Sequence, residues 1–78
     1  MARRIVRTHQ DLAAAMRELR RDRGMTQEGL AEWIGVHRNY IGQLERGDMS
    51  TQMARTFEIL SLLGVDVALE PRGDRLFG

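Results

Sequence analysis

The sequence predicts a mainly α-helical fold in which four short helices are followed by one β-strand. Four successive segments carry the capping residues or apolar stripe of a helix, and each ends at a glycine: Gly24, Gly35, Gly47 and Gly64. Apolar and polar residues then alternate over 65–70, a spacing of two that is typical of a strand. The chain has 78 residues, enough for one small core that a second chain often helps to stabilise. We therefore expect a single domain.

The first helix is expected to follow an N-terminal arm, residues 1–7, which shows no helical period. Thr8 is placed as the N-cap of this helix, and Asp11 follows three residues later in the position of a capping box. The apolar stripe that comes next consists of Leu12, Met16 and Leu19. These signals predict a helix that buries one face and ends at Gly24.

Residues 26–47 predict two short helices joined by one tight turn at Gly35. The first runs over 27–34 from its cap at Thr26, and the second begins at about residue 37 or 38 and ends near Arg46. The residues expected to face the interior of this unit are Leu30, Ala31, Ile34, Val36, Ile41 and Leu44. This is the helix-turn-helix pattern, in which the later helix enters the major groove of DNA by its N-terminal end.

The later of these two helices carries a polar face that suits the reading of bases. Arg38 and Asn39 stand at its start, and Gln43 lies one turn beyond Asn39. Arginine can bind guanine O6 and N7, and Asn or Gln can bind adenine N6 and N7. Gly42 lies one turn beyond Arg38, where the missing side chain is expected to let the helix backbone come close to the groove. We therefore predict base contacts from Arg38, Asn39 and Gln43.

Phosphate contacts are expected where the earlier helix of this unit begins. Thr26 and Gln27 stand there, and unpaired backbone N–H groups together with the helix dipole favour an anion at such a terminus. The formal net charge is only +1, but seven of the twelve Arg lie in residues 1–24 against three acids. All twelve basic residues are Arg, which prefers planar contacts to phosphate and guanine, although genomic base composition explains the absence of Lys equally well.

The stretches TQEGLA, IGVHRNYIG and LERG within residues 26–47 closely resemble the lambda-repressor-like, or XRE-type, helix-turn-helix family. The resemblance covers residues 12–63 and implies a four-helix lambda-repressor-like domain. It places Arg38, Asn39 and Gln43 at base-contacting positions and implies a structural ion pair between the first and third helices. The residues that it places on phosphates are Gln27, Tyr40 and Arg46, and those of the ion pair are Arg20 and Glu45. One departure is Asp48, where many relatives carry Lys or Arg.

The order of the expected elements along the chain indicates one group within this family. A capped helix after an extended arm, and the ending LSLLGVDVALEPRG, are similar to HipB-type antitoxins. The similarity implies a repressor that autoregulates its operon, pairs its C-terminal strand across a homodimer, and binds a HipA-type serine/threonine kinase toxin. The alternatives are a stand-alone XRE-type regulator without a toxin and an interaction module that has lost DNA binding. A kinase-like neighbouring reading frame separates the first two.

A homodimer is also expected from the fourth helix and the strand. The helix starts at Ser50 or Thr51 and ends near residue 63, and its apolar arc is wider than one surface stripe needs. A lone strand leaves N–H and C=O groups unpaired, and a twofold copy of 65–70 satisfies them. The internal alternative is pairing with the arm at Ile5 and Val6. The predicted dimerisation residues are Phe57, Ile59, Leu62, Leu63, Val65, Val67 and Leu69.

We thus divide residues 1–78 into the arm (1–7), the helix-turn-helix domain (8–64), the dimerisation strand (65–70) and a tail (71–78). The arm's Arg3, Arg4 and Arg7 either contact DNA or only aid solubility. A dimer would present two recognition helices about 34 Å apart to a palindromic operator in double-stranded DNA.

Several classes of function are disfavoured by composition. The chain has no Cys, no His placed with acids at metal spacing and no glycine-rich phosphate loop, so we expect no enzyme, no cofactor and no metal site. No stretch suggests a membrane span or a signal peptide, so we expect a bacterial cytoplasmic protein, on the nucleoid when DNA-bound. His9 and His37, near helix starts, are interpreted as capping or surface residues. Trp33 either covers the core edge or anchors a partner.

Overall fold

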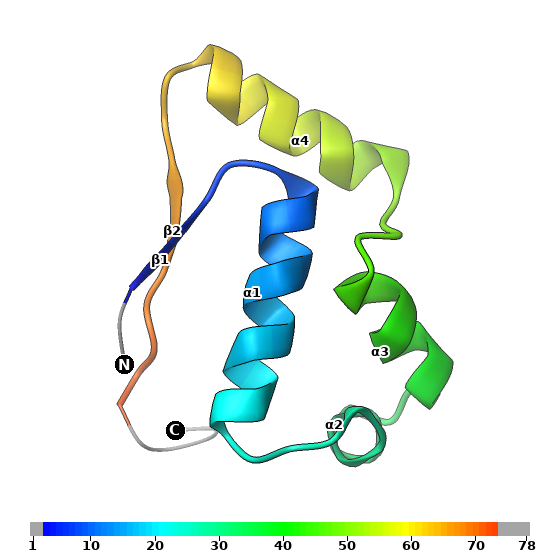
Figure 1. Ribbon diagram of the computed structural model, residues 1–78. Coiled ribbons are helices and arrows are strands. Elements are labelled where there is room, and N and C mark those ends of the chain that lie inside the picture. The colour runs from blue at the N-terminus through cyan, green and yellow to red at the C-terminus, as the bar shows by residue number, and fades with distance from the viewer. Residues whose placement is uncertain (1–2, 74–78) are drawn as a thin grey trace.

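The computed structural model describes residues 3–73 and shows the predicted four helices, together with two short strands (Figure 1). In chain order the elements are β1 (Arg4–Val6), α1 (His9–Asp22), α2 (Gln27–Ile34), α3 (Arg38–Glu45), α4 (Thr51–Leu62) and β2 (Val67–Leu69). The mainly helical prediction is therefore confirmed. The first two residues of the predicted arm and residues 74–78 of the predicted tail lie outside the described part. None of the helices in the described part is long and apolar enough to cross a membrane.

Each helix begins at a side-chain cap, and those of α1, α2 and α4 are residues that the sequence offered as caps. The Thr8 hydroxyl accepts the Asp11 N–H at 3.0 Å, and the Asp11 carboxylate accepts the Thr8 N–H at 3.3 Å, so the capping box is complete. Thr26 and Ser50 cap α2 and α4 in the same manner, and His37 caps α3 through its Nδ1 atom. The capping interpretation of His37 is thus confirmed, and Ser50 rather than Thr51 is the N-cap of α4.

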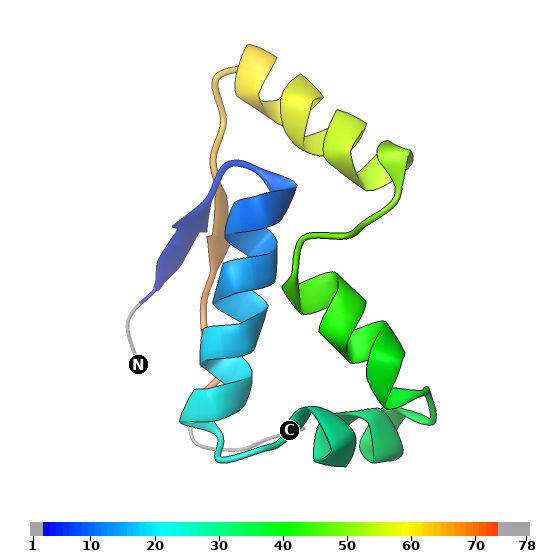
Figure 2. The same cartoon turned by 45° about the vertical axis from the view of Figure 1, so that its right-hand side comes forward.

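Helix α1 forms the centre of the molecule. It contacts β1, α3 and α4, whereas α2 packs chiefly on α3. In Figures 1 and 2 the paired strands run along one side of α1, α4 lies across its N-terminal end, and the α2–α3 pair lies on the other side. The buried apolar residues are Val6, Ala13, Ala15, Ala31, Ile41 and Phe57. The core is small and contains three alanines, because the elements approach α1 and α2 closely.

The two strands answer the question that the sequence left open about the arm. β1 pairs antiparallel with β2 within the chain, with Val6 opposite Val67 and Arg4 opposite Leu69. Val6 is only 1% exposed and joins a core cluster against which Val67 and Leu69 pack. The strand is shorter than the predicted 65–70. Because the arm already pairs one edge of β2, an unpaired strand is a weaker argument for a dimer than the sequence suggested.

Two arginines of the arm tie it to the rest of the fold. Arg4 donates to Glu18 at 3.1 Å and to Asp22 at 2.9 Å, both on α1. Arg7 donates two hydrogen bonds to the Asp66 carboxylate, of 2.7 and 3.2 Å. These bonds hold the pKa of Asp66 below its ordinary value. These cations are balanced within the chain, so the described arm forms part of the scaffold rather than a basic extension.

Three apolar residues lie where the sequence did not place them. Phe57, predicted at the dimer surface, is 7% exposed and packs in the chain's own core with Val6. Ile34 and Val36, predicted to face inward, are 52% and 37% exposed. The physical reason is the position of α4, which packs on α1 at the opposite end of the molecule from α2 (Figure 1). Phe57 therefore meets the arm, and the end of α2 stays uncovered by α4.

Candidate nucleic-acid interface

Helices α2 and α3 form one compact unit through the turn at Gly35. This residue has φ of +77°, a left-handed conformation that glycine adopts without a steric penalty. The N–H groups of Gly35 and Val36 both donate to the Ala31 carbonyl, at 2.9 and 3.0 Å, which closes α2. Ala31 and Ile41 are each 2% exposed where the two helices pack. The described geometry is that of a helix-turn-helix unit.

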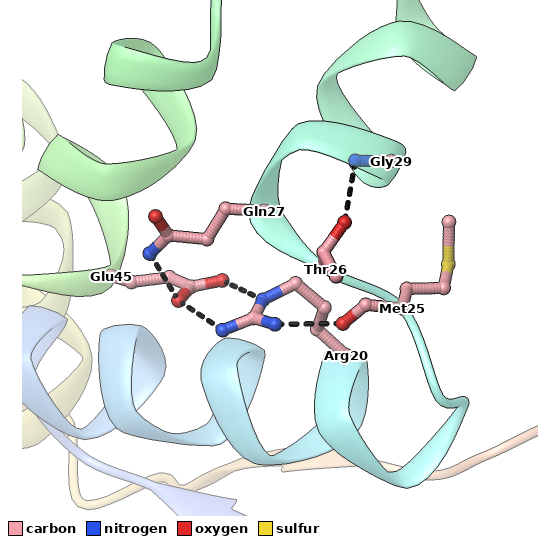
Figure 3. Close-up of polar contacts among 6 residues, drawn as sticks. All are labelled: Arg20, Met25, Thr26, Gln27, Gly29 and Glu45. Carbon is pink, nitrogen blue, oxygen red and sulfur yellow. Dashed lines mark hydrogen bonds and ion pairs between the residues drawn. The ribbon is translucent and has the colours of Figure 1, made fainter.

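A buried ion pair fixes this unit on α1. Arg20 donates to Glu45 through Nε at 2.7 Å and Nη2 at 3.0 Å, and its Nη1 donates to the Met25 carbonyl at 2.7 Å (Figure 3). The two side chains are 9% and 3% exposed. The ion pair that the family resemblance implied is therefore present. Such a planar, doubly hydrogen-bonded pair sets orientation as well as contributing energy.

Gln27 extends the same network from the start of α2. Its Nε2 donates to Glu45 at 3.0 Å, so the Glu45 carboxylate on α3 holds both α1 and α2 (Figure 3). The Arg20 hydrogen bonds hold the pKa of Glu45 below its ordinary value against the opposing effect of burial, with a smaller contribution from Gln27. The sequence did not predict this bond between Gln27 and Glu45, because nothing in the local pattern pairs residues 18 positions apart.

The reading face predicted on α3 forms a polar hollow of about 330 Å³. It is lined by Gln27, Arg38, Asn39, Gly42, Gln43 and Arg46. The structure thus brings together the three predicted base-contacting residues and two of those expected on phosphates. No carboxylate lines the hollow, and two guanidinium groups do, so its chemistry suits an anion or the acceptor edge of a base.

The other two predicted phosphate contacts lie outside this lining. Tyr40 is 50% exposed on α3. The Thr26 hydroxyl is engaged as the cap of α2 and accepts the Gly29 N–H at 2.9 Å (Figure 3). Trp33, for which the sequence left two interpretations, is 64% exposed at the C-terminal end of α2. Its indole is thus a surface feature and not part of the core.

Gly42 differs from its predicted role. It is buried, and a Cβ built on it would lie 3.3 Å from Nη1 of Arg46 and 3.7 Å from Oε1 of Gln27. The space above Gly42 is therefore occupied by side chains of the protein, and the bare helix backbone is not presented to DNA there. The spacing of four residues between Gly42 and Arg46 was visible in the sequence, but the direction of the Arg46 side chain was not.

Comparison with known proteins bears on the same stretch. The family pattern described as "Helix-turn-helix domain" matches residues 11–72. The chain belongs to this family. As a helix-turn-helix protein it is also similar to a protein from Sinorhizobium fredii named "Uncharacterized HTH-type transcriptional regulator y4mF", at 32% identity over 75 residues. That match covers 96% of this chain and 97% of the relative. No solved structure matches the chain.

Membership of the helix-turn-helix family agrees with the geometry of the described unit. The matched residues include all of α1 except its first two residues, the whole of α2, α3 and α4, the turn at Gly35 and both partners of the buried ion pair. They also include the hollow on α3. The family therefore accounts for the architecture of the described residues.

Proposed function

We propose that this helix-turn-helix protein is a sequence-specific DNA-binding transcriptional repressor whose helix α3 enters the major groove. The observation that supports this most is the hollow on α3, which collects two cations and three side-chain amides with no acid. The network of Arg20, Glu45 and Gln27 holds this face rigid relative to α1. Preorganised donors of this kind are what base and phosphate recognition require. The name of the Sinorhizobium relative supports a role in transcription.

In this proposal the residues take two roles. Arg38, Asn39 and Gln43 contact base edges from the start and middle of α3. The phosphate contacts come from Thr26, Gln27, Tyr40 and Arg46. The backbone N–H groups at the start of α2 add to them, because that end of a helix favours an anion.

The proposed active form is a homodimer on a palindromic operator. Four of the predicted dimerisation residues form an exposed apolar surface at the end of α4 and the loop after it: Ile59, Leu62, Leu63 and Val65. Leu62 is the most exposed of them at 88%, and a contiguous apolar patch of this kind often marks a protein–protein contact. The second edge of β2 has no strand beside it among residues 3–73 and is available to a twofold copy.

The finer proposal is that the protein is a HipB-type antitoxin that binds a HipA-type kinase. Its support is the order of arm, capped helix, helix-turn-helix unit and C-terminal strand, which the described fold retains. A stand-alone repressor is the alternative. Co-purification of the tagged protein with a kinase-like product of the adjacent reading frame tests this. A kinase that is bound and inhibited supports the antitoxin, and the lack of any complex rejects it.

DNA recognition itself is tested by selecting binding sites from random duplexes. We expect a palindromic consensus with half-sites separated by about one helical turn. The selected duplex should also bind at least about 10³-fold more tightly than random DNA. Recovery of unselected sequences with equal affinity would contradict sequence-specific binding.

A further inference from the structure

Arg46, like Arg38, is an arginine of the α3 face that forms no ion pair within the described chain. Arg4, Arg7, Arg20 and Arg55 each form an ion pair with a carboxylate of the chain. Among residues 3–73 no carboxylate pairs with Arg46, although its side chain lies at the edge of a tightly hydrogen-bonded network. Its charge is therefore not neutralised by a carboxylate of the described residues, which leaves it available to an external anion.

The position of the Arg46 guanidinium depends on Gly42. Arg46 is the C-cap of α3, and side chains on a helix lean toward the preceding turn. Residue 42 occupies that turn, and its missing Cβ leaves room for Nη1 of Arg46 at 3.3 Å from where the Cβ would stand. A separation of 3.3 Å is tighter than most contacts of a Cβ atom, so a side chain at residue 42 would require the guanidinium to shift by at least a few tenths of an ångström.

The Gln27 side chain, at the start of α2, borders the same space above Gly42. Its Nε2 is committed to Glu45, so its carbonyl oxygen points the other way and lies 3.7 Å from the same point above Gly42. The Arg46 guanidinium and the Gln27 carbonyl oxygen therefore both border the space above Gly42. Gln27 links this space to the buried Arg20–Glu45 pair.

We propose that Gly42 is a positioning residue of the DNA interface. Its missing Cβ lays the Arg46 guanidinium back along α3 toward Gln27, where it holds one phosphate of the DNA backbone. This inference rests on the proposed function and goes beyond it, because it assigns a role to a residue that itself touches no DNA. It also predicts an unusual combination: a substitution that is tolerated or favoured by the fold and harmful to binding.

The test is Gly42→Ala, measured with the selected operator and with random duplex over a range of salt concentrations. Loss of one phosphate contact lowers the slope of log K against log salt by about 1, and lowers affinity for both duplexes in parallel. Alanine is the better helix former, so we expect the melting temperature to stay constant or to rise by at most about 8 °C. A salt slope that stays at the wild-type value would overturn the proposal.

A double-substitution cycle shows whether Gly42 acts through Arg46. Arg46→Ala should lower the slope by the same amount, and adding Gly42→Ala to it should change nothing further. This background also covers the case in which Gly42→Ala alone unfolds the protein, because the double variant removes the crowded guanidinium. A further loss of affinity in the double variant would show that Gly42 acts directly and would reject the role assigned to it.

Two controls separate this inference from the proposed function. Arg55→Ala removes one cation from α4, at the far end of the molecule from α2, and should leave the salt slope at the wild-type value (Figure 1). A salt slope that falls equally in the Arg55→Ala variant would show that only net charge matters. It would reject the role of Gly42 in positioning Arg46. Wild-type protein that binds neither duplex would refute the proposed function. Wild-type binding with an unaltered Gly42→Ala variant would refute only the present inference.

Discussion

At the scale of single residues, the proposed interface separates side chains that read bases from those that hold phosphates. Arg38 stands at the start of α3, lines the hollow and forms no ion pair among the described residues. Arg38→Ala should weaken operator binding by about 1–3 kcal/mol and relax preference at one base pair per half-site. Titration of the operator and of random duplex measures this. Equal losses on both duplexes would assign Arg38 to phosphate instead.

Glu45 makes the fold depend on pH in a defined direction. Its pKa is lowered in the folded state, mainly by the Arg20 hydrogen bonds, from an unfolded value of about 4.3. The stability that this shift contributes is therefore present above about pH 4.3 and is lost as pH falls through the lower, folded pKa. Removing one partner of a buried pair costs about 3–5 kcal/mol at neutral pH.

Glu45→Gln is the variant that tests this. Its deficit in the free energy of unfolding, relative to wild type, should be largest near pH 7 and should shrink below about pH 4. Denaturant titrations at several pH values measure the difference. The exposed Glu32→Gln on α2 is the matched control and should change stability little at any pH. A deficit that stays constant from pH 7 to pH 3 would show that the charge of Glu45 is not what stabilises the pair.

At the scale of elements, what the sequence could predict follows the range of the interactions. Helix starts at Thr8 and Thr26 depend on contacts three residues long, and they were predicted at the observed residues. The burial of Phe57 and the exposure of Ile34 depend on where α4 packs, which periodicity does not encode. The position of the Arg46 guanidinium over Gly42 depends on the rotamer of Arg46, which the sequence does not specify. For these reasons the composition of the α3 face was predictable, but its internal support was not.

The pairing of β1 with β2 makes the arm a structural element with its own testable contribution. Val6 is 1% exposed in the core cluster, whereas its neighbour Ile5 is 46% exposed on the same strand. Val6→Ala removes two buried methyl groups and leaves a small cavity, so we expect a loss of about 2 kcal/mol in unfolding free energy. Ile5→Ala removes more atoms and should cost much less. Similar losses at both positions would mean that the arm does not pack as described.

At the scale of the whole molecule, the proposed DNA-binding and dimerisation surfaces lie at different ends. The hollow lies on α2 and α3, whereas the exposed apolar side chains lie at the C-terminal end of α4 and just after it. Helices α2 and α4 lie at opposite ends of the molecule (Figure 2). α1 and the ion pair between Arg20 and Glu45 connect the two. In the proposed dimer the α4 ends meet and both α3 helices face DNA. Substitutions at the end of α4 should therefore disrupt assembly without altering the α3 face.

Leu62→Asp is the sharpest test of that separation. Leu62 is 88% exposed, so in the monomer the substitution removes little packing, but in a dimer it would bury an unpaired carboxylate. We expect subunits with unchanged helix content that sediment as monomers. Operator affinity should fall steeply, because two half-site contacts are no longer linked in one molecule, while affinity for an isolated half-site should change little.

Gln52→Asp, an exposed position ten residues earlier on α4 and about 15 Å away, is the matched control and should remain dimeric. A Leu62→Asp protein that still sediments as a dimer and binds the full operator as wild type does would move the interface off the end of α4, and the second edge of β2 would then be the remaining site for a twofold copy.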